Sequence, residues 1–135
     1  MDGIDGVREV LEAREDVRLA YLFGSAAKAH TRPSSDVDVA VLLAAVPPPR
    51  DVDRLVADLE VVAKRSVDLV ILNSAPPLLG HEVLKNGRVI VCRDEDEHVR
   101  FETRAIARYL DTAHLRHVQH GYLHEWAEAY RARSG

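Results

Sequence analysis

The first third of the chain passes from a helical to an alternating pattern of hydrophobic positions. In residues 3–14 apolar side chains recur every three or four positions, which predicts a short amphipathic helix. Residues 17–23 (VRLAYLF) and 36–43 (DVDVAVLL) are mainly apolar and predict two buried strands. Between them, residues 25–29 predict a helical turn and residues 31–35 (TRPSS) a polar turn.

Helical and strand patterns continue to alternate after this point. The proline triplet at 47–49 predicts a stiff connector, and residues 55–62 predict a second amphipathic helix. A third strand is expected over 67–72, and a third helix over 76–86, which Asn-Gly ends. Residues 88–93 (RVIVC and an arginine) predict the fourth strand.

From residue 94 onward the chain is predicted to be helical, in two pieces that break near Asp111 or Gly121. Strands that alternate with helices favour a layered α/β sheet covered by helices. No internal repeat or change in composition marks a second domain. We therefore expect one domain over residues 1–135, with its core at about 17–93 and a C-terminal helical part at about 94–133.

Composition and charge narrow the possible classes of protein. The 135 residues contain 18 Lys and Arg against 22 Asp and Glu, a net charge of −4 that argues against non-specific nucleic-acid binding. A single cysteine excludes an intrachain disulfide and a cysteine-based zinc finger. The acidic N-terminal segment does not resemble a secretory signal, and no apolar run reaches the ~18 residues of a membrane span. We expect a cytoplasmic protein without membrane contacts.

One constellation of residues points to chemistry. Gly24-Ser25 ends the first strand, and after a gap of ten residues Asp36-x-Asp38 opens the second. Side chains two positions apart in a strand lie on one face about 7 Å apart, so the two carboxylates could share a pair of Mg²⁺ or Mn²⁺ ions that bridge to phosphates. Gly24 permits close backbone approach, and Ser25 offers a hydroxyl and an amide. Together they form a candidate phosphate cradle.

A third carboxylate, Asp68, interrupts an otherwise apolar strand. A buried carboxylate without a partner is costly, and joining the other two at a metal would supply a reason for it. In the alternative interpretation Asp36 is a turn residue, Asp38 lies on a solvated face and Asp68 carries a strand-edge charge. That interpretation is favoured for an Asp-x-Asp pair alone. The combination with Gly24 and a third aspartate favours a site.

These residues carry a resemblance to a known family. The Gly-Ser pair, the ten-residue gap and the Asp-x-Asp pair resemble the signature of the DNA polymerase β-like nucleotidyltransferase superfamily. Residues 17–111, with YLFGSAAKA, SSDVDVAVLL and NSAPPLLGHEVLKNGRVIV, resemble its minimal nucleotidyltransferases, the MntA-type antitoxins that pair with HEPN-domain toxins. The resemblance implies a polymerase β-like palm fold with a mixed sheet of about four strands, flanked by helices.

The resemblance also implies a role for each candidate residue. The residues expected to bind the nucleotide are Gly24, Ser25, Lys28 and Ser35. Those expected to hold Mg²⁺ and to act in catalysis are Asp36, Asp38 and Asp68. The sequence departs from the family pattern after the serine, where Ala27-Lys28-Ala29 replaces Ala-Arg-Gly. Lysine keeps the positive charge but loses the bidentate fork of arginine, and alanine restricts the turn.

The activity implied by the resemblance is transfer of AMP from Mg-ATP to a tyrosine of a cognate HEPN ribonuclease toxin, which inactivates the toxin. Two alternatives stay open. One is a nucleotidyltransferase acting on a small, aminoglycoside-like alcohol. The other is a non-catalytic antitoxin that masks its toxin by contact.

Other polar residues are assigned to structure rather than chemistry. Cys92 is expected to be a small buried hydrophobic residue, and residues 94–97 (DEDE) to start a helix. Arg32 is equally consistent with a nucleotide contact and with a solvated loop. Four histidines fall on one arc of the last predicted helix and are expected to face solvent or a partner rather than a metal: His114, His117, His120 and His124.

Overall fold

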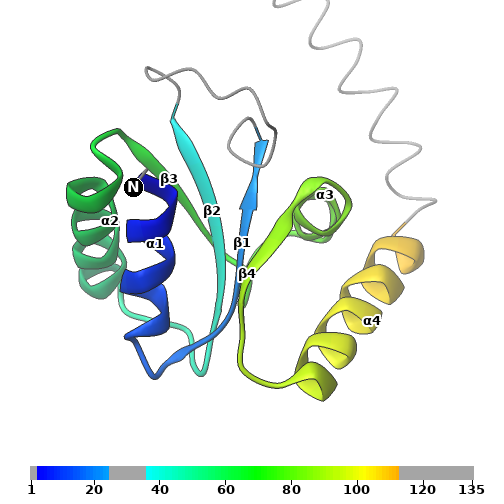
Figure 1. The fold of residues 1–135 in the computed structure, drawn as a ribbon. Helices are drawn as coiled ribbons and strands as arrows, with labels where there is room; N and C mark the ends of the chain where they lie inside the picture. Colours follow the sequence, from blue (N-terminus) through cyan, green and yellow to red (C-terminus); the bar gives the residue numbers. More distant parts are fainter. Residues whose placement is uncertain (1–2, 25–35, 113–135) are drawn as a thin grey trace, which may run out of the picture.

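The computed structural model describes residues 3–24 and 36–112, which form a sheet between two pairs of helices (Figure 1). In chain order the elements are α1 (Gly3–Glu12), β1 (Val17–Phe23), β2 (Val37–Leu43), α2 (Pro49–Ala63), β3 (Val67–Ile71), α3 (Pro77–Asn86), β4 (Arg88–Cys92) and α4 (Glu95–Asp111). Among these described residues, no helix is long and apolar enough to cross a membrane.

The four strands form a mixed sheet in the order β3-β2-β1-β4. β1 runs antiparallel to both β2 and β4, whereas β2 runs parallel to β3. Parallel neighbours need a crossover connection, and α2 supplies it. The expected mixed sheet of about four strands is confirmed. β3 and β4 are its edge strands.

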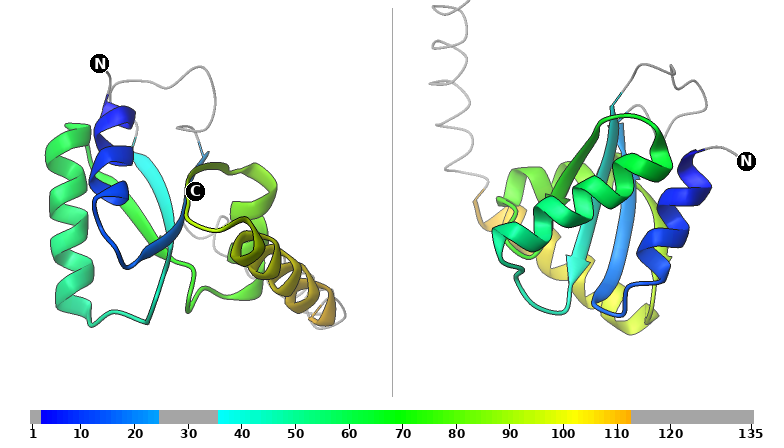
Figure 2. Two further views of the ribbon diagram at one scale, coloured as in Figure 1. Left: turned by 60° about the horizontal axis from the view of Figure 1, so that its bottom comes forward. Right: turned by 90° about the vertical axis from the view of Figure 1, so that its left-hand side faces the viewer.

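Each face of the sheet is covered by two helices, α1 and α2 on one side and α3 and α4 on the other (Figures 1 and 2). Aliphatic side chains fill the space between the sheet and the first pair, with the helices contributing Val7, Leu11, Leu55, Leu59 and Ala63. A smaller core under α3 and α4 is built on Leu19, Tyr21, Ala40, Leu72 and Val83. The three layers follow from the two periodicities of the sequence, because strands bury both faces and helices only one.

A change of register in β1 determines which side chains face which helices. The pairing with β2 shifts between Val17 and Leu19. As a result Val17 and Leu22 belong to the core under α1 and α2, whereas Leu19 belongs to the core under α3 and α4. Arg18 lies at the shift, where its Nε donates to Glu97 Oε1 at 2.8 Å and so connects β1 to α4.

The predicted elements within the described ranges are confirmed; most of their ends differ by one or two residues, but α2 begins at Pro49, well before the predicted start at 55. Pro49 was assigned to the connector but begins α2, because proline suits the first turn of a helix. α4 ends at Asp111, one of the two predicted break points. Cys92 is only half-buried, so its prediction as a buried residue is wrong. The helical turn at 25–29 and the second helical piece after 112 lie outside the described residues.

Candidate active site

Three carboxylates lie together at the beginnings of two neighbouring strands. Asp38 is the second residue of β2 and pairs in parallel register with Asp68, the second residue of β3. Asp36 precedes β2 and lies two positions from Asp38. Residues two apart in a strand, and residues in register on adjacent strands, share one face of a sheet. Because Val37 and Val39 face α1 and α2, the carboxylate of Asp38 lies on the opposite face, the one covered by α3 and α4.

Among the described residues, this group is a cluster of negative charges without a paired cation. Burial raises the pKa of Asp38 above its ordinary value of 3.8, and the charges of Asp68 and Asp36 raise it further. Within the described ranges, none of the three carboxylates has a salt bridge or a side-chain hydrogen bond. Hard carboxylate oxygens concentrated in this way suit a divalent cation such as Mg²⁺ or Mn²⁺. The donor set therefore fits the expected metal.

The reason given for Asp68 from the sequence needs correction. We expected a carboxylate buried inside an apolar strand, but Asp68 is exposed. β3 is an edge strand, and its second residue is exposed to solvent. The cost of burial therefore falls on Asp38, which is partly buried, and not on Asp68.

Gly24 brings the end of β1 against the carboxylates. Its φ is +63°, in the left-handed region that favours glycine. A Cβ at this position would collide with Asp38 Oδ2. The backbone conformation favours glycine, and any side chain here would force the Asp38 carboxylate to move. The sequence indicated close backbone approach to a ligand at Gly24, and the structure shows an equally close approach to a candidate metal ligand.

Several predicted site residues cannot be placed against this geometry. Ser25, Lys28 and Ser35, together with Arg32, lie between the two described ranges, and the four histidines lie after residue 112. Their roles stay predictions. The structure thus brings together Gly24 and the three aspartates.

A cavity at the other end of the sheet was not foreseen. It has a volume of about 380 Å³ and lies between α3, α4 and the ends of β2 and β3. Its lining includes Leu42, Leu72, Asn73, Phe101, Arg104 and Arg108. The Asn73 amide bonds the backbone N–H and C=O of Leu43, at 2.9 and 2.7 Å, so this polar residue serves the fold. The cavity contains none of the three carboxylates, and on chemical grounds the active site lies with the carboxylates.

A scan against protein families finds one that fits this geometry. The model of the family described as "Polymerase beta, Nucleotidyltransferase" matches residues 6–96, which include Gly24 and all three aspartates. The chain belongs to this nucleotidyltransferase family. Among curated protein sequences, none matches significantly.

Solved structures agree with the family assignment. A chain from the crystal structure of a toxin–antitoxin with AMP-PNP is 26% identical, with a TM-score of 0.75, over 88% of this chain and 97% of that one. A second, from the tri-AMPylated Shewanella oneidensis HEPN toxin in complex with its MNT antitoxin, is 24% identical with a TM-score of 0.73, over 90% and 96%. A structure described as a putative minimal nucleotidyltransferase is 29% identical with a TM-score of 0.55, over 65% and 95%. The expected nucleotidyltransferase fold is confirmed.

Proposed function

We propose that this nucleotidyltransferase transfers AMP from Mg-ATP to a tyrosine hydroxyl of a cognate HEPN-domain ribonuclease toxin and thereby inactivates it. The observation that carries the proposal is the juxtaposition of Asp36, Asp38 and Asp68, with the backbone of Gly24 against Asp38. The similarity to chains from a toxin–antitoxin bound to AMP-PNP and from a tri-AMPylated toxin complex supports both the nucleotide and the acceptor.

All three aspartates are proposed to bind the metal, and Asp68 is proposed to accept the hydroxyl proton as well. Asp36 and Asp38 follow directly from the segment that begins at Gly24, and with Asp68 they would hold Mg²⁺, or Mn²⁺ in its place. The metal, when bound, supplies positive charge that neutralises the triphosphate. Asp68 is exposed on an edge strand, so a hydroxyl on another protein can reach it. We assign Asp68 to accept the hydroxyl proton while the new O–P bond forms and pyrophosphate leaves.

The phosphate contacts are assigned to the chain that follows Gly24. Ser25, Lys28 and Ser35 are proposed to bind the triphosphate. Gly24, at one end of this segment, lies against Asp38 in the structure. Asp36, which follows the other end, lies two positions before Asp38 in the sequence. A nucleotide held by the segment would therefore lie next to the carboxylates. The same proposal places the protein in the cytoplasm with a protein partner, without direct contact to nucleic acid or membrane.

Transfer of label from ATP tests this function. The purified chain is incubated with ATP labelled on the α-phosphate, Mg²⁺ and the product of a neighbouring gene that encodes a HEPN protein. We expect the wild-type chain to place label on a tyrosine of that protein. The Asp68→Asn chain should place no label on it. The control is Asp58→Asn, an exposed aspartate on α2 at the opposite face of the sheet.

Each outcome separates the proposal from its alternatives. Label on the toxin that persists in Asp68→Asn would contradict the role of Asp68. Label that appears only on added aminoglycoside-like alcohols would support the small-molecule enzyme instead. A toxin that is neutralised without acquiring label would support masking.

A further inference from the structure

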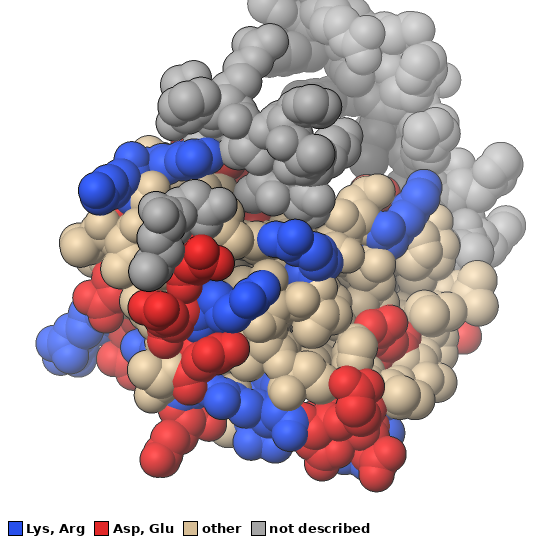
Figure 3. Space-filling view, viewed as in Figure 1, with Lys and Arg blue, Asp and Glu red and all other residues tan. Residues whose placement is uncertain are grey.

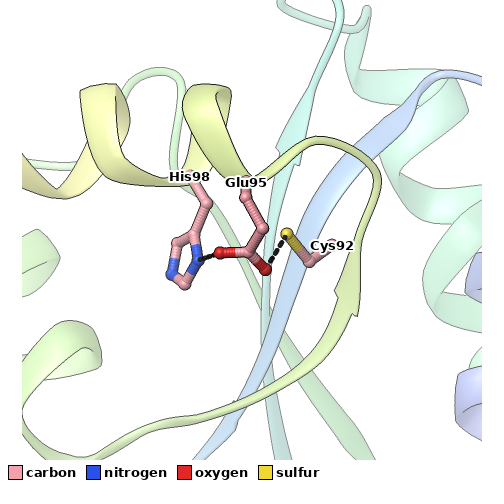
Figure 4. A group of neighbouring side chains, drawn as sticks. All are labelled: Cys92, Glu95 and His98. Atoms are coloured by element: carbon pink, nitrogen blue, oxygen red, sulfur yellow. Dashed lines mark hydrogen bonds and ion pairs between the residues drawn. The ribbon is translucent and has the colours of Figure 1, made fainter.

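A second group of metal-binding side chains lies where β4 meets α4. Cys92, Glu95 and His98 each offer one ligand atom, and these atoms all lie within 4.8 Å of one another (Figure 4). Cys92 Sγ is 3.4 Å from Glu95 Oε1, and His98 Nδ1 is 3.6 Å from Glu95 Oε2. In the sequence the three residues form the pattern Cys-x-x-Glu-x-x-His.

The fold holds these three residues in place through its backbone. Cys92 is the last residue of β4 and pairs with Leu19 in the sheet. Asp94 caps α4 by accepting a hydrogen bond from the N–H of Asp96 at 2.9 Å, which fixes the helix start. Glu95 is then the first helical residue, and His98 lies three positions later on the same side of the helix. The cluster is therefore built by a strand end and a capped helix.

The donor set and its spacing suit zinc. Thiolate, imidazole and carboxylate are the three ligand types that proteins use for Zn²⁺, with metal–ligand lengths of about 2.0–2.3 Å in a tetrahedron. Ligand atoms around such an ion lie about 3.3–3.7 Å from one another, which follows from those lengths. Cys92 Sγ lies 3.4 Å from Glu95 Oε1 and His98 Nδ1 lies 3.6 Å from Oε2, so both separations fall in that range but reach different oxygens of the one carboxylate. A single ion would take both oxygens, or the exposed Glu95 side chain would turn to offer one of them to both neighbours. Three protein ligands leave a fourth position for water.

A second observation, independent of the trio, comes from the far side of the histidine. His98 Nε2 is hydrogen-bonded to Glu102 Oε1, which also accepts from the Tyr21 hydroxyl at 3.4 Å. The ring of His98 packs edge-on against Tyr21, and only 19% of its side chain is exposed. A carboxylate on the second nitrogen is the support that metal-binding histidines usually have. With Nε2 bonded to Glu102, the other ring nitrogen, Nδ1, lies 3.6 Å from Glu95 Oε2 and is the atom available to a metal beside that carboxylate.

The surroundings also favour a cation. Glu95, Asp96 and Glu97 all lie in the first turn of α4, and acidic side chains gather at the lower end of this helix (Figure 3). Their charge offsets the positive end of the helix dipole, which would otherwise oppose a metal ion.

The Cys92 thiol has to lose its proton when a metal binds. Burial and the hydrogen bond to Glu95 raise the pKa of Cys92, so the metal has to displace that proton.

We propose that Cys92, Glu95 and His98 bind one Zn²⁺ ion that fastens the start of α4 to the end of β4. The site is separate from the catalytic carboxylates. Cys92 pairs with Leu19 near the start of β1, whereas Asp38 pairs with Phe23 at its end. Among the described residues α4 contributes none that is fully buried, and it reaches the sheet through partly buried side chains such as Glu97, Phe101 and Glu102, so this ion would add a further link between the helix and β4.

Cobalt binding to the full-length chain tests the proposal, because cysteine thiolate bound to Co²⁺ gives a charge-transfer absorption band. The chain has one cysteine, so this band reports on Cys92 alone, whatever the histidines after residue 112 bind. We expect a band that saturates at one Co²⁺ per chain and is displaced by Zn²⁺. Cys92→Ser should abolish it. His98→Gln and Glu102→Gln should each weaken Zn²⁺ binding at least about tenfold, as losses of ligands and of their supporting carboxylates do.

Two control variants and a second measurement complete the test. Asp38→Asn, in the other carboxylate group, and His81→Gln, a histidine of α3 that stacks on Tyr109, should keep the band. Zn²⁺ should also raise the unfolding temperature of the wild type but not of Cys92→Ser, whose metal-free folding is checked by circular dichroism. Absence of the band in the folded wild type, or equal Zn²⁺ affinity in His98→Gln, would overturn the proposal.

Discussion

Asp38 is the residue at which the fold and the chemistry conflict most directly. It is partly buried beside Asp36 and Asp68, and these causes raise its pKa in the folded chain. Folding therefore makes its proton harder to lose, so the free energy of unfolding falls as the pH rises through that pKa. We predict that Asp38→Asn stabilises the metal-free protein near neutral pH by up to ~1 kcal/mol, the upper range for exposed charge pairs.

Urea unfolding at several pH values measures this difference. The gain from Asp38→Asn should shrink as the solution becomes acidic enough to protonate Asp38 in the wild type. The exposed Asp58 on α2 provides the control, since Asp58→Asn should give no comparable gain. A difference that stays constant across the acidic range would contradict the electrostatic explanation.

Gly24 is predicted to be intolerant of any side chain. Gly24→Ala places a Cβ against Asp38 Oδ2 at a left-handed φ, so the free energy of unfolding should fall by about 1–3 kcal/mol. Affinity for Mg-ATP, measured by calorimetry, should fall with it. Gly80→Ala is the matched control, because it lies within α3 with nothing within 4 Å and alanine favours a helix. It should be neutral or stabilising, and an equally mild effect at Gly24 would show that the close approach is not required.

At the level of single residues, the sequence predicted Gly24 and the three aspartates but not all of their environments. The spacing of Asp36 and Asp38 predicted that they would lie close together, and the structure places Asp36 directly before β2 and Asp38 within it. The exposure of Asp68 depends instead on β3 being an edge strand, which no local pattern reveals. The half-exposed position of Cys92 depends in the same way on α4, whose start lies beside it.

Among the elements, α1 packs into the core through Val7 and Leu11, and its C-terminal end is held by one arginine. Arg93 follows β4, and its guanidinium donates to four backbone carbonyls at 2.6–3.3 Å, two from the end of α1 and two from the turn and strand after it: Leu11, Glu12, Arg14 and Val17. Carbonyls at a helix C-terminus lack partners within the helix, so this side chain acts as its cap.

We predict that Arg93→Ala lowers the free energy of unfolding by about 1.5–3 kcal/mol, the range for hydrogen bonds to charged groups. Arg93→Lys should recover little of this loss, because an ammonium cannot reproduce the planar fork. Arg100→Ala, an exposed arginine of α4, is the control and should lie close to the wild type. Full recovery with lysine would indicate that charge alone, and not the geometry of the cap, matters.

The elements themselves were more predictable than their arrangement. Strand and helix positions follow from local hydrophobic spacing, and most ends differ from the prediction by one or two residues. The order β3-β2-β1-β4 rests on contacts between distant segments, such as Leu19 with Cys92, which periodicity does not encode. The register shift after Val17 also escaped prediction, since VRLAYLF is apolar on both faces. The resemblance to the nucleotidyltransferases supplied the mixed sheet.

On the scale of the whole molecule, the open question is whether the antitoxin proposed here acts by catalysis or by contact. Asn at positions 36 and 38 keeps the side-chain volume but removes the charges proposed to hold the metal. If the two aspartates are metal ligands and not structural residues, the doubly substituted protein should stay folded. The substitutions also remove the repulsion between the two carboxylates in the metal-free protein. AMP transfer should fall by orders of magnitude, since it depends on charge stabilisation at the triphosphate.

We predict that this Asp36→Asn, Asp38→Asn chain fails to protect cells that express the cognate toxin, although it accumulates to normal levels and still binds the toxin. Abundance is measured by immunoblot, binding by co-purification, and protection by colony counts after toxin induction. The Asp58→Asn chain, whose change lies on α2 beyond the opposite face of the sheet, should protect as the wild type does. Binding and catalysis are measured separately in this design, and the substitutions add no bulk that would obstruct a partner. Protection by a folded, toxin-bound but inactive chain would therefore mean that contact suffices, and that the carboxylate cluster serves some reaction other than neutralising the toxin.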